Sequence, residues 1–334
     1  MKTTLFIGAG FSAAFGYPVM DSFFSYADFC KRVTDEERAL LRELVLEARR
    51  ANSFLESSPT NLEDILSFSE MGERLQLISG ADSRTDRLRS IIQRVYSDVT
   101  APKEYWPRYK KLEKFLGKDL SECKDSLSFV TTNYDLNIES ACIAAQIQTD
   151  PGFEIDRIPG QGVRTLGSCY STGGVPLYKL HGSVNWYPSD SEPGIRIDDR
   201  IVAIQSWDES RSLPVICTGD YCPAGSPAIV PPSFLKPDLS NALKGVWRGA
   251  ARVLSEANTI VFVGYSFPPS DTEMMFFLAK ALSENAGLRA LYLVDPKANE
   301  ITARLRRADT RIGSHFRDLL HPIQSRWEEA KLEV

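Results

Sequence analysis

The chain lacks several patterns that would point to particular protein classes. Its six cysteines form no C-x-x-C pair, and the closest two, Cys217 and Cys222, have no second pair to complete a zinc module. No apolar stretch reaches membrane-spanning length, and glycines interrupt the apolar N-terminus where a signal peptide would need continuity. The net charge of −5 gives no overall basic field for nucleic acid. We therefore expect a cytoplasmic protein with reduced thiols, no metal, no membrane contact and no direct nucleic-acid binding.

What is present is an alternation of strand-like and helix-like segments. Apolar runs bounded by turn residues, such as TTLFI, DSLSFV, VPLYKL, NTIVFV and LRALYLV, are typical of buried parallel strands. Segments between them, such as LNIESACIAAQ and DTEMMFFLAKALSEN, have apolar residues at helical spacing. This alternation predicts an α/β fold, a Rossmann-like doubly wound parallel sheet, formed by residues 1–334 as a single domain.

Two inserts are expected in this domain. Residues from about 22 to 120 keep helical periodicity throughout, with a helix start at Thr34 before an acidic run, and predict an inserted helical subdomain. Residues from about 183 to 237 are richer in Pro, Gly and Asp and predict loops that decorate the sheet, with short strands at RIVAIQS and PAIVPP. The final stretch, RDLLHPIQSRWEEAKLEV, is interpreted as a helix.

Short polar residues and glycines follow five of the predicted strands. Ligands of open α/β sheets bind beyond the carboxyl ends of the strands, so these residues are the candidates for a site. They are GAGFS at 8–12, TTNYD at 131–135, HG at 181–182, GYS at 264–266 and DP at 295–296. Each has a structural alternative, because Asn, Asp and Ser stabilise turns and Asp-Pro can begin a helix. All five at one sheet edge together predict a binding site.

The first of these motifs, Gly8-x-Gly10-x-x-Ala13, matches the glycine pattern of a dinucleotide site. Glycines allow the backbone to approach a pyrophosphate, whose charge is met by amides at a helix start. The same small residues also make a tight strand-to-helix turn, so both interpretations stand. The acidic residue expected about twenty positions later falls in the helix-like FSYADF, which disfavours the common dehydrogenase arrangement.

His181 is one of only three histidines and follows the apolar run VPLYKL. One interpretation is a buried structural histidine. The other is a proton-transferring histidine at the lip of the site, since imidazole titrates near neutral pH.

The motifs GAGFS, TTNYD, KLHGS, VGYSFPPSD and LVDP, in this order, together resemble the sirtuin-like NAD-consuming family. They are similar in particular to its divergent bacterial branch in anti-phage defence, as is PAIVPPSFLKP. The resemblance spans nearly the whole chain outside the helical insert. It implies a Rossmann-like domain that takes NAD as its substrate.

The resemblance also implies a role for each candidate residue. Asn133 would hold the nicotinamide ribose and the attacking group, Asp135 the carboxamide, and His181 would be the general base. Asp295 would meet the hydroxyls of the adenosine ribose, where a carboxylate favours NAD over NADP. The remaining residues would contact the diphosphate and the adenosine ribose: Gly8, Ala9, Gly10, Ser12, Gly264 and Ser266.

Departures from the deacylase sirtuins favour one activity within the family. The chain lacks their two C-x-x-C pairs, and GYPVMDSFF stands where they have Gly-Ile-Pro-Asp-Phe-Arg. The resemblance therefore implies an NAD glycohydrolase, a regulated effector that depletes NAD in anti-phage defence. Alternatives are an NAD-dependent deacylase or ADP-ribosyltransferase, and a non-catalytic module that senses NAD or ADP-ribose. The expected partners are further copies of the chain or a trigger protein such as an ATPase, contacted through the helical insert.

Overall fold

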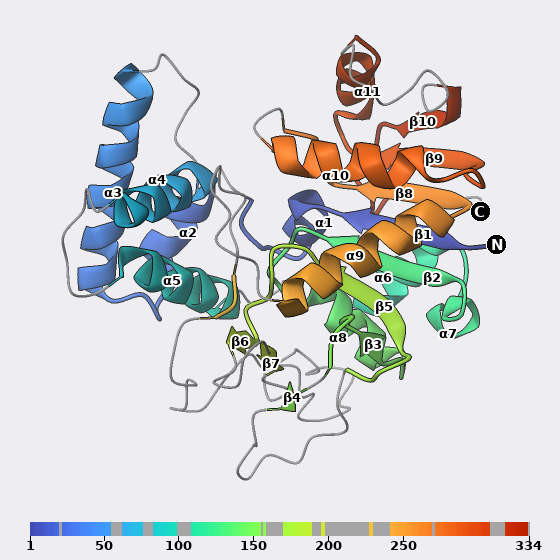
Figure 1. The fold of residues 1–334 in the computed structure, drawn as a ribbon, viewed down its shortest axis with the longest axis horizontal. Coiled ribbons are helices and arrows are strands. Elements are labelled where there is room, and N and C mark those ends of the chain that lie inside the picture. The colour runs from blue at the N-terminus through green and yellow to red at the C-terminus, as the bar shows by residue number, and fades with distance from the viewer. Residues whose placement is uncertain are drawn as a thin grey trace.

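The fold is built on a parallel β-sheet (Figure 1). The computed structural model describes residues 1–19, 22–54, 62–75, 83–98, 108–154, 156–157, 170–188, 195–197, 227–229, 241–268, 271–307 and 318–332. Within these ranges a seven-stranded sheet has the order β10-β9-β8-β1-β2-β5-β3, and each adjacent pair is parallel. The strands are β1 (Thr3–Ile7), β2 (Leu127–Thr131), β3 (Thr149–Asp150), β5 (Val175–Lys179), β8 (Thr259–Val263), β9 (Ala290–Val294) and β10 (Leu320–Ile323). The predicted doubly wound parallel sheet is confirmed.

The centre of the sheet is fully buried, which explains its continuous apolar sequence. Phe6 of β1 lies in register with Val130 of β2 and Phe262 of β8, and none of the three is appreciably exposed. Helices cover both faces: α9 (Asn241–Glu256) contacts α10 (Thr272–Ser283), while α6 (Arg108–Leu116) contacts α8 (Asn137–Ala144). The short α1 (Ala9–Ala13), α7 (Leu120–Cys123) and α11 (Ala298–Arg307) complete these layers.

A separate helical group lies beside the sheet, at the left of Figure 1. It consists of α2 (Phe23–Phe29), α3 (Asp35–Phe54), α4 (Leu62–Arg74) and α5 (Arg84–Asp98), which pack on one another. The helix start at Thr34 is a capping box, because the Thr34 hydroxyl accepts from the Glu37 amide while Glu37 accepts from the Thr34 amide. The group is narrower than the predicted range of 22–120, since α6 and α7 lie against the sheet.

The predicted C-terminal helix is wrong. Residues Leu320–Ile323 form β10, which pairs in parallel with β9 at the edge of the sheet. Pro322 explains the difference, because proline disrupts a helix interior but is tolerated in an edge strand. Beyond it, Trp327 stacks on Phe11 of α1 with ring centroids 4.5 Å apart and donates its indole N–H to the Phe11 carbonyl at 3.1 Å.

The predicted loop-rich insert lies largely outside the described residues. Its described parts include β6 (Trp186–Pro188) and β7 (Ile195–Ile197), which with β4 (Asp156–Arg157) form a small three-stranded sheet. Ile229 makes an isolated bridge to Gly182. The strand predicted at RIVAIQS and the cysteines Cys217 and Cys222 fall outside the described ranges.

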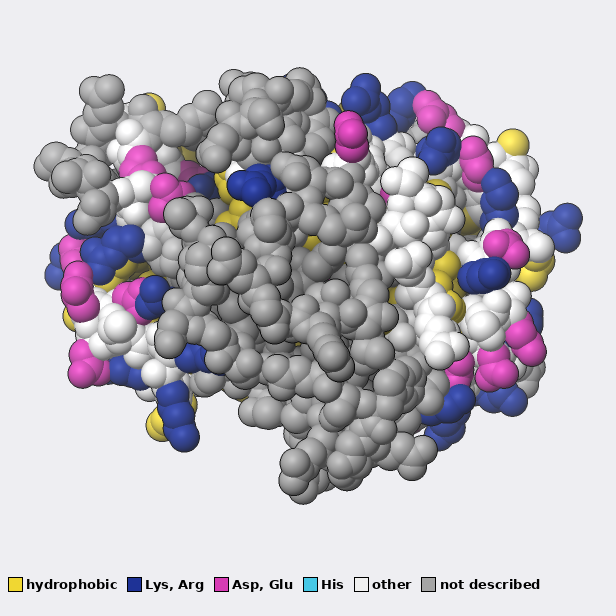
Figure 2. Space-filling view, turned by 90° about the horizontal axis from the view of Figure 1, so that it is seen from below, with side chains coloured by type: hydrophobic (Ala, Val, Ile, Leu, Met, Phe, Trp, Pro, Cys, Tyr) yellow, Lys and Arg dark blue, Asp and Glu magenta, His cyan; other side chains and the backbone are white. Residues whose placement is uncertain are grey.

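Acidic and basic side chains are interspersed on the face shown in Figure 2, as far as the structure describes it. This mixed surface agrees with the composition of the sequence, which contains 44 acidic and 39 basic residues. Among the described helices, none combines the length and the apolar character that crossing a membrane requires.

Candidate functional site

A cavity of about 400 Å³ opens at the carboxyl ends of five strands. These strands, β9, β8, β1, β2 and β5, are consecutive neighbours in the sheet, so the five sequence motifs that follow them come together. All of the predicted site residues except Gly8 line the cavity: Ala9, Gly10, Ser12, Asn133, Asp135, His181, Gly264, Ser266 and Asp295. The cavity is of a size and position typical of ligand sites in α/β proteins.

A larger hollow of about 730 Å³ lies at the opposite edge of the sheet. It is lined by residues from the beginnings of strands, including Thr4, Ser128 and Val175. None of the predicted site residues reaches it. Because ligands of open parallel sheets bind at the other edge, we assign the site to the smaller cavity.

The glycines of the site allow the turns after β1 and β8 to touch through their backbones. The Gly8 amide donates to the Val263 carbonyl and the Gly10 amide to the Gly264 carbonyl, both at 2.9 Å. Gly264 has a φ of +61°, and a Cβ there would lie 2.5 Å from the Phe11 nitrogen. Close backbone packing therefore explains the glycines at these positions without any ligand. Since the amides of Gly8, Gly10 and Phe11 are already bonded, a diphosphate would have to rely on other groups of the turn.

Ser12, Asn133 and Asp135 form one hydrogen-bonded group at the middle of the cavity. The Ser12 hydroxyl donates to the Asp135 carboxylate at 2.6 Å, and the Asn133 amide donates to Ser12 Oγ at 3.0 Å. The same Asn133 amide donates to the Gly8 carbonyl at 2.9 Å, which ties the loop after β2 to the turn after β1. Asp135 is buried, and its other oxygen accepts from the Asn137 amide at the start of α8. Asp135 therefore stabilises the turn before α8, as a structural residue would, and also lines the cavity.

His181 is placed in the cavity by a tight turn at the end of β5. Gly182 has a φ of +80°, and a Cβ on it would lie 1.8 Å from the Ala228 carbonyl oxygen, so only glycine fits. His181 is 3% exposed, and its ring centroid lies 6.3 Å from that of Tyr134. Burial in contact with an open cavity is compatible with both interpretations of this histidine.

The helical group contributes a residue that sequence reasoning missed. Tyr96 of α5 lines the cavity and meets Tyr134 edge to face, with centroids 6.2 Å apart. Its hydroxyl donates to the Pro18 carbonyl at 3.4 Å. No sequence signal distinguishes Tyr96 from the other aromatic residues of an amphipathic helix, because its place depends on how the helical group docks.

The β8–β9 end of the cavity is more polar and more exposed. Asp295 accepts from the Lys297 amide at 2.8 Å, so it does begin the turn into α11 while also lining the cavity. Ser266 is exposed, and its carbonyl accepts from Arg304. Lys297 and Asp271 also line this cavity and were not predicted. Asp271 is explained locally, because it caps α10 through the Met274 amide and accepts from the Tyr265 hydroxyl.

The described cysteines and metal-binding residue types offer no competing chemistry near the site. Burial, aided by the nearby Glu139, raises the pKa of the Cys142 thiol in α8, so this thiol stays protonated and is not a nucleophile. Within the described ranges, no three His, Cys, Asp or Glu residues cluster as metal ligands would. Cys217 and Cys222 lie outside these ranges, so the absence of zinc stays a prediction.

Comparison with known proteins assigns the family. Residues 127–313, more than half of the chain, match the family model for the SIR2-like domain. The chain belongs to the SIR2-like domain family. The matched segment contains four of the five strand-end motifs, with only GAGFS lying before it. Membership of this family supports an NAD-dependent activity in general.

Similar solved structures include two sirtuin complexes. A complex of Sir2Tm with a propionylated peptide is 15% identical, covers 98% of this chain and 89% of its own, and has a TM-score of 0.37. A substituted Sir2 homologue bound to ADP-ribose is 14% identical, covers 98% of this chain and 88% of its own, and has a TM-score of 0.39. Among curated protein sequences, none matches the chain.

Proposed function

We propose that the chain is an NAD hydrolase that cleaves the bond between nicotinamide and ribose, releasing nicotinamide and ADP-ribose. One observation carries the proposal: the five strand-end motifs converge on one cavity, with Asn133, Asp135 and His181 at its β2–β5 end. The adenosine half of NAD would lie toward Ser266 and Asp295 at the β8–β9 end. This arrangement brings the nicotinamide ribose beside the histidine.

The side chains at this end suit the chemistry of the reaction. Departure of neutral nicotinamide takes the electron pair of the C–N bond and leaves a cation-like ribose, which buried polar groups stabilise. A water oxygen then forms the new bond to the ribose carbon and gives its proton to His181. Asn133, held by Gly8 and Ser12, orients the ribose or the water, and Asp135 binds the carboxamide.

Two features favour water over a peptide as the acceptor. Tyr96 and Pro18 line the cavity at the end that holds Tyr134 and His181, so bulky groups narrow the space beside the base. The sequence also lacks the C-x-x-C pairs of the deacylase sirtuins. The aromatic lining favours a small nucleophile such as water, and the missing C-x-x-C pairs set the chain apart from the deacylases.

The test is to incubate purified protein with NAD, with and without an acyl-lysine peptide, and to follow nicotinamide and ADP-ribose by chromatography. Release of both products without peptide supports hydrolysis. Dependence on the peptide would instead indicate a deacylase or a transferase. Binding of NAD or ADP-ribose without turnover, in every assembly state that can be prepared, would indicate a sensing module.

The proposal includes regulation and assembly. An unrestrained NAD hydrolase would harm its own cell, so a role in anti-phage defence requires a gate, either self-assembly or a partner such as an ATPase. The helical group is the proposed contact surface, because its α2 exposes apolar side chains, Phe29 at 87% and Tyr26 at 40%.

A further inference from the structure

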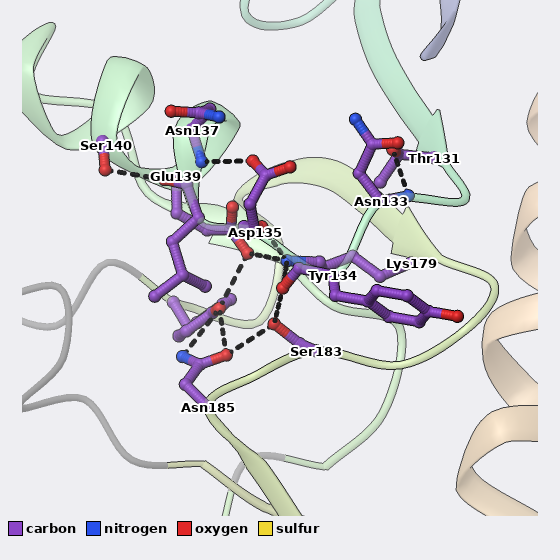
Figure 3. A network of polar contacts seen from close by, with 12 residues as sticks. Thr131, Asn133, Tyr134, Asp135, Asn137, Glu139, Ser140, Lys179, Ser183 and Asn185 are labelled. Atoms are coloured by element: carbon purple, nitrogen blue, oxygen red, sulfur yellow. Dashed lines mark hydrogen bonds and ion pairs between the residues drawn. The ribbon is translucent and has the colours of Figure 1, made fainter. Parts of the chain in front are cut away.

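A buried charge lies behind the loop that carries Asn133 and Asp135. Lys179, the last residue of β5, is 1% exposed, and its ammonium group meets three acceptors (Figure 3). It donates to the Tyr134 carbonyl at 3.3 Å and to the Asp135 carbonyl, and it pairs with the Glu139 carboxylate at 2.9 Å. Three acceptors match the three hydrogens of an ammonium group, so the charge is fully bonded despite its burial.

The partner of Lys179 belongs to a wider buried network. Glu139 is 0% exposed and lies in the first turn of α8, where a carboxylate is favoured by the helix dipole. It accepts from the Tyr170 hydroxyl at 3.0 Å, and Tyr170 in turn accepts from Asn185 at 3.1 Å. Asn185 accepts from the Ser183 hydroxyl at 2.7 Å. The network thus joins the loop after β2 to the segment on both sides of His181.

A contribution to the stability of the fold does not by itself explain this buried charged network. The free energy needed to remove two charges from water often exceeds their attraction, so apolar residues of similar size would stabilise the fold as well or better. What the network does define is the geometry of the loop. Figure 3 shows the Asn133 and Asp135 side chains on one side of this loop, while Ser183 and Asn185 lie on the other.

We propose that Lys179 is a positioning residue for the site. By holding the carbonyl oxygens of Tyr134 and Asp135, it fixes the rotation of the loop so that the Asn133 amide and the Asp135 carboxylate face the cavity. Glu139 keeps the ammonium in place and does not line the cavity. The reaction affected is the proposed hydrolysis, on which this inference rests, but ligand binding reports on the same geometry.

The deciding comparison is between Lys179→Met and the double variant Lys179→Met/Glu139→Gln. The single variant leaves a buried carboxylate without its cation, so its unfolding temperature should fall clearly. The double variant removes both charges and should recover most of that loss. It still lacks the donors to the loop, so its NAD turnover should stay about tenfold or more below wild type, because small misplacements of reacting groups cost about that much. Its affinity for NAD, measured by calorimetry, should fall as well.

A matched control is available at the C-terminal end of α10, where Lys280 and Glu284 form an exposed ion pair at 2.6 Å. Lys280→Met/Glu284→Gln should match wild type in unfolding temperature, affinity and turnover, since exposed pairs contribute little. Recovery of NAD affinity and turnover together with stability in the Lys179 double variant would overturn the proposal. If that variant does not fold, Tyr170→Phe decides: a fall of about threefold or more in turnover at unchanged unfolding temperature supports positioning, and unchanged turnover contradicts it.

The result also separates this inference from the proposed function. If wild-type protein binds NAD without releasing nicotinamide, the hydrolase proposal fails, and the affinities of the variants still test the positioning role. If wild-type protein does not bind NAD at all, both proposals fail together.

Discussion

The two ends of the cavity are built by different means. At the β8–β9 end, the turn carrying Gly264 and Ser266 is held by backbone contacts with the turn after β1, and its polar side chains are partly exposed. At the β2–β5 end, buried side chains hold the loops, through Lys179 and Glu139 behind the site and Ser12 within it. At the first end, close backbone packing fixes the path of the turn that lines the cavity. At the second end, side-chain hydrogen bonds hold Asn133 and Asp135 in defined orientations, as the proposed hydrolysis would require.

At the backbone-held end, the expected effect is on stability. Gly264→Ala adds a Cβ 2.5 Å from the Phe11 nitrogen at a φ of +61°, so backbone must move as well as adopt a strained conformation. We expect a loss of about 3 kcal/mol or more in the free energy of unfolding, measured by urea denaturation. Gly173→Ala is the matched control, because its φ is +81° but nothing lies within 4 Å, and it should lose only about 1 kcal/mol. Equal losses would contradict the role given to backbone packing.

At the side-chain-held end, the expected effect is on activity. Ser12→Ala removes the donor to the Asp135 carboxylate and the acceptor for the Asn133 amide. A hydrogen bond to a charged group contributes about 1.5–3 kcal/mol, so kcat/KM for NAD should fall about tenfold or more. Steady-state kinetics on Ser12→Ala and on the exposed-site control Ser283→Ala checks this. A Ser12→Ala enzyme with wild-type kcat/KM would show that the group does not act as a unit.

The smallest expected effect concerns the choice between NAD and NADP. Asp295 presents a carboxylate at the β8–β9 end, so wild-type protein should prefer NAD, whereas Lys297 on the same rim attracts a phosphate. Asp295→Asn should lower the ratio of NAD affinity to NADP affinity about threefold, and Lys297→Met should raise it by a similar factor. The effects are small because exposed charges are screened. Affinities of both variants for the two dinucleotides give the answer. Tighter binding of NADP by wild-type protein would contradict the assignment of Asp295.

The sequence predicts residues at both ends of the cavity but not the buried contacts behind its β2–β5 end. Gly8, Gly10 and Gly264 are visible as glycines after apolar runs, and the strand periodicity predicts that their turns share an edge. Lys179 and Glu139 could not be paired in advance, since a charged residue in a strand and one in a helix give no signal of mutual burial. Tyr96 was missed for a similar reason: its position depends on the docking of α5. The sequence interpretation of residues 320–323 as helix is wrong, and Pro322 is the residue that disfavours a helix there.

The central claim is that Asn133 and His181 carry out NAD cleavage, and it is tested most directly by measuring turnover and unfolding temperature on the same preparations. Asn133→Ala and His181→Ala should each reduce nicotinamide release about a hundredfold or more while the protein stays folded. His321→Ala, on the exposed side of β10, should leave both quantities unchanged. A His181→Ala protein with a lower unfolding temperature and undiminished turnover would show a structural histidine, and would contradict this account.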